Sequence, residues 1–253
     1  MTTDSTITYR IDGPVAVIAL DKPKLNTLDI AILDGLIAAL KRAGDDDDIR
    51  AVILTSALEK AFCAGLDLAP VLDGGSAMMR ALLQRLYIEL FDVQHNLGKP
   101  SIAAVAGIAR GGGMTLSLSC DVVVAADTAS FGYPEFHVGI LPGIHFTHLP
   151  RVVGRHKAFE LLFGAAPFDA PEAARLGLVN RVVYTGDLMA TAMTMARDFA
   201  AKPSQAVKLG RAAFMDINDD GYRQSIASVV ETMALMIDSD ETRDALRRFL
   251  RRE

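Results

Sequence analysis

The chain has 253 residues, a length that suits one large domain with an appended helical segment. Apolar residues make up 51% and charged residues 23%, so a substantial core can be buried and disorder along the whole chain is disfavoured. The formal net charge of −5 argues against nucleic acid as a main partner, because phosphate binding needs a basic surface. The two cysteines, Cys63 and Cys120, lie in apolar stretches and favour a reduced, cytoplasmic protein. Without a signal segment or a membrane-spanning apolar run, no membrane partner is expected.

The first elements predicted are a hairpin, a helix and a buried strand. Residues 7–10 and 15–20 have the composition of strands and flank the turn Asp12-Gly13-Pro14. Apolar residues at helical spacing predict an amphipathic helix over 29–42, and the apolar run 51–56 predicts a fully buried strand. A second helix is predicted to end near "NLGKP". The positions that carry these helices are Leu33, Leu36, Ile37 and Leu40, then Leu83, Leu86, Tyr87 and Leu90.

The remaining chain alternates short apolar strands with helices or turns and ends in a long helical stretch. This alternation predicts an α/β fold with a stacked sheet core. We divide the chain into a core with the active site, residues 1–195, and a C-terminal helical region, residues 196–253. The strands are expected at 101–109, 121–127, 129–134 and 179–183.

The segment "ARGGGMTLSLSCD" places three consecutive glycines directly before a predicted helix. It lacks the GxGxxG spacing and the lysine of nucleotide-binding loops. An amide without side-chain obstruction could instead face an oxygen that becomes negative during reaction, as in an oxyanion hole. The loop "AFCAGLDL", after the strand 51–56, is a candidate for the second amide, with Asp67 as a cap for the next helix.

With these loops the sequence resembles the crotonase family, also called the enoyl-CoA hydratase/isomerase superfamily. The resemblance covers about residues 5 to 200, with the motifs in family order and at family spacing. It implies a ββα spiral core and a coenzyme A thioester as substrate, so CoA enters with the substrate and no separate cofactor or metal is expected. The matching stretches are "LNTLD" (25–29), "AFCAGLDL" (61–68), "GKPSIAAVAGIARGGG" (98–113), "SCDVVVAADTASFGYPE" (119–135), "GILPG" (139–143) and "ARLGLVNRVV" (174–183).

The resemblance also implies site residues. The amides of Ala64 and Gly112 match those that hold the thioester carbonyl oxygen, where they would stabilise an enolate. Lys22 and Lys24 match positions that meet the nucleotide part of CoA, although a solvated loop charge is nearly as plausible. The segment 69–86 should line the acyl pocket, or simply be core. Further residues expected at the substrate are Cys63, Gly65, Leu66, Asp67, Leu68, Gly111, Met78 and Leu82, with Cys63 in a packing role rather than as a nucleophile.

Two departures from the family pattern bear on the reaction. Family hydratases resemble each other in carrying two glutamates; Glu135 matches the second, but Thr115 stands at the first. A hydroxyl can orient water but cannot replace a carboxylate as an acid or base near neutral pH. The loop "PGIHFTHLPR" keeps Gly143, which matches a position whose amide contacts substrate or water, but is one residue shorter and carries His145 and His148. His145 could be a surrogate acid, base or specificity residue, or a histidine satisfied locally.

We therefore expect an acyl-CoA enzyme that works through a thioester enolate. One-base Δ3–Δ2 enoyl-CoA isomerisation by Glu135 is favoured over the alternative, an enoyl-CoA hydratase in which Thr115 or His145 holds the water. A non-catalytic CoA-binding or assembly protein is the alternative from another class. The resemblance further implies a homotrimer or a dimer of trimers, with a C-terminal helix that covers the active site.

Overall fold

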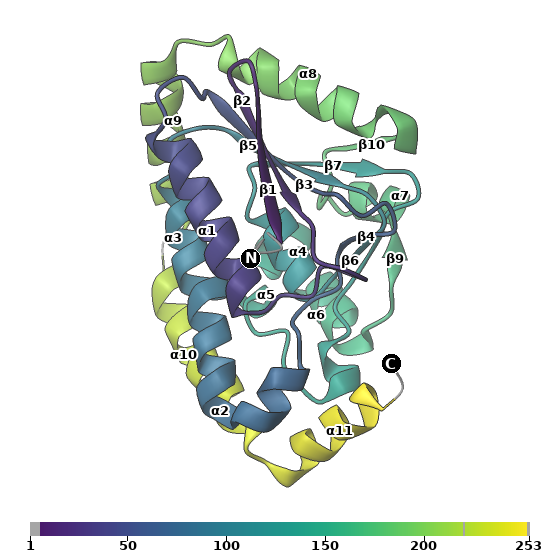
Figure 1. The fold of residues 1–253 in the computed structure, drawn as a ribbon. Helices are drawn as coiled ribbons and strands as arrows, with labels where there is room; N and C mark the ends of the chain where they lie inside the picture. The colour runs from purple at the N-terminus through teal and green to yellow at the C-terminus, as the bar shows by residue number, and fades with distance from the viewer. Residues whose placement is uncertain (1–5, 220, 252–253) are drawn as a thin grey trace, which may run out of the picture.

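The computed structural model describes residues 6–219 and 221–251, and its fold is drawn in Figure 1. Six strands form the larger sheet, in which the first pair is antiparallel and the other neighbours are parallel. The predicted strands 15–20 and 51–56 appear with those bounds. In spatial order the strands are β1 (Ile7–Asp12), β2 (Val15–Leu20), β3 (Ala51–Ser56), β5 (Ser101–Val105), β7 (Val122–Ala126) and β10 (Arg181–Val183).

A smaller sheet contains β4 (Ala61–Cys63), β6 (Ile108–Arg110), β8 (Ser130–Gly132) and β9 (Phe168–Asp169). Three successive segments each supply one strand to the larger sheet and the next strand to the smaller one: β3 then β4, β5 then β6, β7 then β8. The single strand expected over 101–109 is therefore wrong. The chain turns at Gly107 between β5 and β6, where a side chain would overlap the carbonyl of Lys60.

Helices surround the two sheets. The predicted first helix is α1, capped by the Asp29 carboxylate, which accepts from the Ile32 amide. A kink at Gly75 interrupts α2, which continues through a π-helical turn into α3. The helices are α1 (Ile30–Asp45), α2 (Ala69–Leu83), η1 (Gln84–Glu89), α3 (Leu90–His95), α4 (Gly112–Leu118), η2 (Glu135–Val138), α5 (His145–Val153), α6 (Arg155–Gly164), α7 (Ala170–Arg175), η3 (Thr185–Asp187), α8 (Leu188–Ala200), α9 (Ser204–Asn218), α10 (Tyr222–Ile237) and α11 (Asp240–Leu250).

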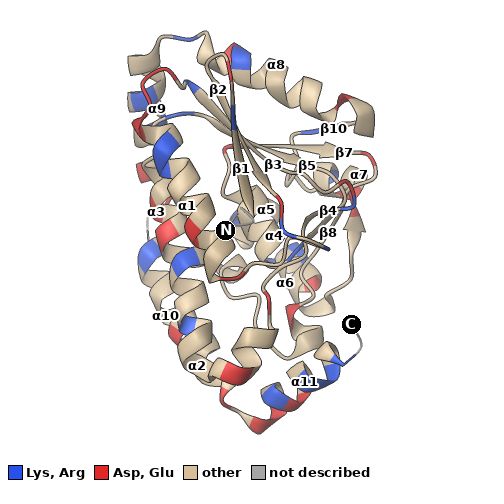
Figure 2. Cartoon of the chain, in the orientation of Figure 1, with Lys and Arg blue, Asp and Glu red and all other residues tan. Residues whose placement is uncertain are grey.

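Both faces of the larger sheet are buried at β2, β3, β5 and β7, which explains why these strands are nearly continuous apolar runs. In β2, Val15 and Val17 pack with α8 on one face, while Ala16 and Ile18 join the main core on the other face. Figure 1 shows α8 lying across one side of this sheet and the longer helices on the opposite side. The sheets carry few charged residues in Figure 2, and most Lys, Arg, Asp and Glu lie on the outer helices and loops.

The C-terminal helices return to the region of α2 and η2. Arg80 of α2 pairs with Glu231 of α10 at 2.9 Å, and the Ser76 amide donates to the Asp238 carboxylate. In α11, the Thr242 hydroxyl donates to the Gly139 carbonyl just after η2. The division at residue 195 stays a prediction. Within the described ranges, no helix is both long and apolar enough to cross a bilayer.

Candidate active site

Three loops meet where the parallel strands β4, β6 and β8 end. Their carboxyl ends lie at the same edge of the smaller sheet, so the residues after Cys63, Arg110 and Gly132 converge there. A methyl group placed on Gly65 would lie 3.7 Å from the Gly112 amide nitrogen. A methyl group on Gly111 would lie 3.1 Å from a carboxylate oxygen of Glu135. Residues far apart in sequence therefore form one small site.

The three consecutive glycines serve different purposes. Gly111 has φ +49°, a backbone conformation that favours glycine, and it lies against the Glu135 carboxylate. A side chain on Gly112 would press on Leu28, and its Cβ would lie 3.6 Å from the Gly65 carbonyl carbon. A side chain on Gly113 would overlap the backbone of Cys63. Close packing therefore accounts for Gly113 and also limits Gly112, whereas Gly111 lies against the Glu135 carboxylate.

The amides of Leu66 and Gly112 are among those that this edge leaves free. Within the described ranges, neither amide has a hydrogen-bond acceptor, although the neighbouring Asp67 amide donates to the Leu28 carbonyl. The expectation for Ala64 is wrong, because its amide donates to the Leu25 carbonyl at 3.0 Å and cannot also hold a substrate oxygen. Two residues later in this loop, the Leu66 amide is free.

The Glu135 carboxyl group is buried beside these amides. Glu135 is only 7% exposed, and its Oε2 atom has no hydrogen-bond partner within the described part of the chain. Burial raises the pKa of Glu135 to about 7, because the lost water outweighs the hydrogen bond from the residue's own backbone amide. Burial is the main cause that raises the pKa of the Tyr87 and Tyr133 phenols, and the charge of Glu135 raises it further. A carboxyl group poised near neutrality can both accept and return a proton.

Thr115, His145 and His148 form a hydrogen-bonded row next to Gly111. The Nε2 atom of His145 lies 3.4 Å from the Thr115 hydroxyl and 3.4 Å from the Gly111 carbonyl oxygen. Its Nδ1 atom lies 3.3 Å from Nε2 of His148. His145 is fully buried, with its ring edge-on to Tyr133 at 4.5 Å. Burial lowers the pKa of both histidines, for His148 to about 4, so both rings are neutral near pH 7.

The chain was compared with known proteins. Residues 10–253 match the family model described as enoyl-CoA hydratase/isomerase. The chain belongs to this family. It is 35% identical over 241 residues to the short-chain-enoyl-CoA hydratase of Clostridium acetobutylicum, covering 94% of this chain and 92% of the relative. It is 33% identical over 238 residues to the crotonyl-CoA hydratase of Syntrophomonas wolfei, covering 93% and 91%.

Solved structures agree with the crotonase fold. An enoyl-CoA hydratase/isomerase from Xanthobacter autotrophicus Py2 superposes with a TM-score of 0.87 at 31% identity, covering 98% of this chain and 97% of the other. An enoyl-CoA hydratase from Bacillus halodurans reaches 0.90 at 24% identity, which supports the fold alone. The predicted family and fold are confirmed, and the protein is an enzyme of the hydratase/isomerase family.

Lys22, expected at the nucleotide part of CoA, is used inside the chain instead. Its Nζ donates to the Thr27 carbonyl at 2.9 Å and to the carboxylates of Asp29 and Asp67 at 2.8 and 3.2 Å. An ammonium group has three donors, so these contacts leave none for a phosphate, and that expectation is wrong in this structure. Asp67 thus ties its loop to Lys22 as well as accepting from the Ala69 amide near the start of α2. The expectation for Lys24 stays a prediction.

Cys63 and Gly143 lie close to the site in different ways. Cys63 is buried, and burial raises the pKa of its thiol to about 12, so the thiol is protonated near neutral pH. Gly143 is buried under α10, where a side chain would overlap Val229 and Met233. A contact of Gly143 with substrate or water stays a prediction, as do contacts of Leu68.

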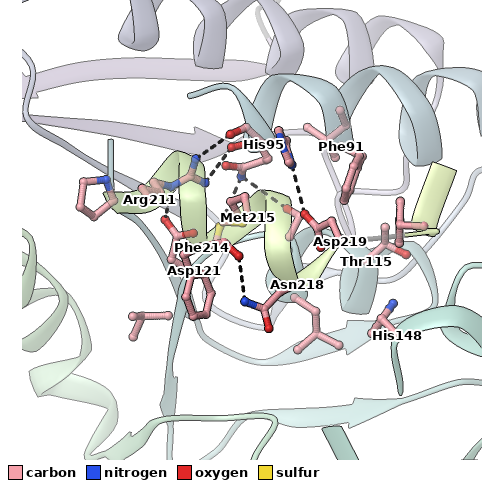
Figure 3. Close-up of a pocket in the computed structure, with 18 of the residues that line it drawn as sticks. Phe91, His95, Thr115, Asp121, His148, Arg211, Phe214, Met215, Asn218 and Asp219 are labelled. Atoms are coloured by element: carbon pink, nitrogen blue, oxygen red, sulfur yellow. Dashed lines mark hydrogen bonds and ion pairs between the residues drawn. The ribbon is translucent and has the colours of Figure 1, made fainter. Parts of the chain in front are cut away.

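A cavity of about 760 Å³ lies beyond Thr115 and His148 as seen from Glu135. In Figure 3 these two residues lie at one side, and the Arg211–Asp121 ion pair lies at the other. Much of the lining is apolar, with Leu86, Leu90, Phe91, Leu118, Phe214 and Tyr222 among its residues. Met78 and Leu82, predicted for the acyl pocket, do not line this cavity, and their contact with substrate stays a prediction.

Several contributors to the site could not be singled out from the sequence. Asn26 is fully buried, and its amide donates to the Phe62 carbonyl at 3.0 Å and to the Ser56 hydroxyl at 2.8 Å, which fixes the loop that carries Leu66. The phenol of Tyr133 lies buried beside His145 and Glu135. Asn26 lies in the family stretch "LNTLD", which was the one available signal for it.

Proposed function

We propose that this enzyme binds an acyl-CoA thioester with its carbonyl oxygen between the amides of Leu66 and Gly112, and uses Glu135 as its single acid–base group. The observation that carries the proposal is the buried Glu135 carboxyl group, whose Oε2 atom has no partner in the described part of the chain, beside two free amides. Two oriented amides in a site with little water stabilise an oxyanion by several kcal/mol. Loss of a proton beside a thioester creates such an oxyanion.

Within this chemistry, we favour migration of a double bond from C3 to C2. Ionised Glu135 removes a proton from C2 of a 3-enoyl thioester, and the electron pair moves into the carbonyl to form a dienolate. The protonated Glu135 then returns that proton to C4, which leaves the double bond between C2 and C3. One carboxyl group completes the cycle, in agreement with the neutral Thr115 at the position of the first family glutamate and the neutral His145 beside it.

Hydration of a 2-enoyl thioester is the second candidate, and it is favoured by relatives that are named enoyl-CoA hydratases. In this reaction ionised Glu135 accepts a proton from the water whose oxygen adds to C3, and Glu135 then delivers that proton to C2. The water would be oriented by the Thr115 hydroxyl, which lies 3.4 Å from His145. Neutral imidazole and hydroxyl groups can orient this water, but they compete poorly with a carboxylate as its base.

The decisive experiment supplies matched 2-enoyl-CoA and 3-enoyl-CoA series and measures water addition separately from bond migration. We expect migration to dominate in the parent, and we expect Thr115→Glu to raise water addition by restoring a second carboxyl group. Efficient hydration by the parent, with no gain in Thr115→Glu, would establish the hydratase alternative. Binding of CoA without turnover of either series would instead support a non-catalytic role.

The cavity beyond Thr115 bears on the substrate. We propose that the apolar lining of this cavity receives part of the acyl group, because the cavity begins at Thr115, which borders the reaction centre.

The C-terminal helices bear on assembly. We also propose the homotrimer, or dimer of trimers, that the family resemblance implies. Leu209, Phe214 and Ile217 of α9 are 60%, 64% and 77% exposed in the single chain, and a partner subunit would bury them. Light scattering tests the assembly.

A further inference from the structure

His145 lies against the peptide group that carries one of the two free amides. The Gly111 carbonyl and the Gly112 amide are the two ends of a single peptide unit. The His145 Nε2 atom is 3.4 Å from the Gly111 carbonyl oxygen. The imidazole therefore contacts the side of this peptide unit that is opposite the amide hydrogen of Gly112. The same carbonyl oxygen also accepts from the Thr115 amide at 3.1 Å, and the Thr115 hydroxyl lies 3.5 Å away, so the imidazole is an additional donor to this peptide unit.

Donation from His145 to Gly111 requires one particular tautomer of its neutral ring. A carbonyl oxygen can only accept, so the contact with Gly111 requires the proton of the neutral ring on Nε2. The Nδ1 atom then accepts from Nε2 of His148, which lies 3.3 Å away. The His145 ring is fully buried and packs edge-on against Tyr133, and this packing restricts its orientation. In this pair of tautomers the row His148 to His145 to Gly111 donates toward the peptide unit, and the His148 proton lies on Nε2 instead of facing the Ile144 carbonyl.

We propose that His145 is a positioning residue that orients and polarises the Gly111–Gly112 peptide unit, and so strengthens the Gly112 amide as a donor to the substrate's oxyanion. A hydrogen bond to a carbonyl draws electrons toward its oxygen and makes the amide hydrogen of the same unit more positive. Such coupling strengthens the next bond of a chain by about 10–30%. The inference rests on the proposed oxyanion hole, and gives the short histidine-containing loop a role in it.

The size of the effect follows from the worth of an oxyanion donor. Removing one donor costs about 10²–10³ in kcat, so weakening it by about 10–30% should cost about two- to eightfold. Because the interaction strengthens as negative charge develops, the loss should fall on kcat while KM changes little. General disruption of the site would instead alter KM and stability together.

The test compares three substitutions of one residue. In His145→Gln, the side-chain NH₂ group extends about as far as Nε2 and can still donate to Gly111. The side chain in His145→Asn is polar but too short, and that in His145→Leu has similar bulk without a donor. Each is measured for kcat, KM and folding. Each is also combined with Glu135→Gln to halt turnover, and the infrared carbonyl frequency of a bound 2-enoyl-CoA labelled with ¹³C at C1 is recorded.

We expect the bound carbonyl frequency to lie below its value in water in the parent and in His145→Gln, and to move back toward that value in both His145→Asn and His145→Leu. The kcat of these last two should fall about two- to eightfold relative to His145→Gln. Equal frequencies and kcat values in all folded variants would overturn the inference; if the leucine variant does not fold, the Gln–Asn pair decides. No lowering of the frequency in any background, the parent at residue 145 included, would refute the oxyanion hole itself.

Discussion

Replacing Glu135 by glutamine separates what this side chain does for catalysis from what it costs the fold. The glutamine keeps the size of the carboxyl group and removes its charge and basicity. A general base contributes about 10²–10⁴ in rate, so Glu135→Gln should lose at least about 10² in kcat while thioester binding is nearly retained. In the parent, the rate of proton abstraction should rise with pH through about 7, where the carboxyl group ionises.

The same substitution has a predictable effect on stability. The folded-state pKa of Glu135 is raised from 4.5 to about 7, so the folded protein holds a proton that the unfolded chain releases between these values. Stability is therefore lost as pH rises from about 4.5 to 7, and the full loss applies above 7. At about 1.4 kcal/mol per pH unit, this loss amounts to about 3 kcal/mol as an upper estimate. Glu135→Gln removes it.

Urea unfolding at pH 5 and pH 8.5 measures the effect. We subtract the unfolding free energy of the parent from that of Glu135→Gln at each pH. We expect this difference to increase by up to about 3 kcal/mol from pH 5 to pH 8.5, because only the parent loses stability over this range. Glu59→Gln, at an exposed position, is the control and should show no such trend. Activity within about tenfold of the parent would refute Glu135 as the sole base. A pH-independent difference would refute the raised pKa.

Three further substitutions test the surroundings of the site. Lys22→Met should lower the unfolding free energy by about 1–3 kcal/mol and leave KM for acyl-CoA within about twofold, whereas a large rise in KM without destabilisation would restore the CoA contact. Cys63→Ser should retain activity within about tenfold, and the parent thiol should resist alkylation at neutral pH; rapid alkylation that abolishes activity would contradict the protonated thiol. Gly113→Ala should cost about 1–3 kcal/mol in urea unfolding, whereas Gly164→Ala, with open space around it, should cost less; equal costs would contradict the packing role.

The sequence predicted the parts of this fold that depend on local hydrophobic pattern. The runs 15–20 and 51–56 are fully apolar or nearly so, and strands buried on both faces need that composition. The stretch 101–109 is equally apolar but divides between two sheets. Its division depends on the tight approach of Gly107 to Lys60, a tertiary contact that the composition does not reveal.

The site shows the same limit at the level of single atoms. Glu135 and Gly112 were predicted because family motifs mark their positions. Which amide of the loop 61–68 stays free could not be predicted, since Ala64 is occupied by the distant Leu25 carbonyl. The positive charge of Lys22 is readable in sequence, but the acceptors that use it are fixed only by folding. In each case the chemical type was correct, and the partner decided the role.

The exchange of a second carboxyl group for Thr115 and His145 changes how the remaining one is tuned. Two carboxylates in one dry site raise each other's pKa by repulsion, which makes the acid–base pair depend on both. Here His145 and His148 are both neutral, and burial is the main cause that raises the pKa of Glu135. The helix α11 packs against the turn that begins with Glu135, and its Thr242 hydroxyl donates to the Gly139 carbonyl at the end of that turn. The basicity of the site is therefore coupled to the packing of the C-terminal helices, and loosening α11 should lower the pKa of Glu135 toward its ordinary value.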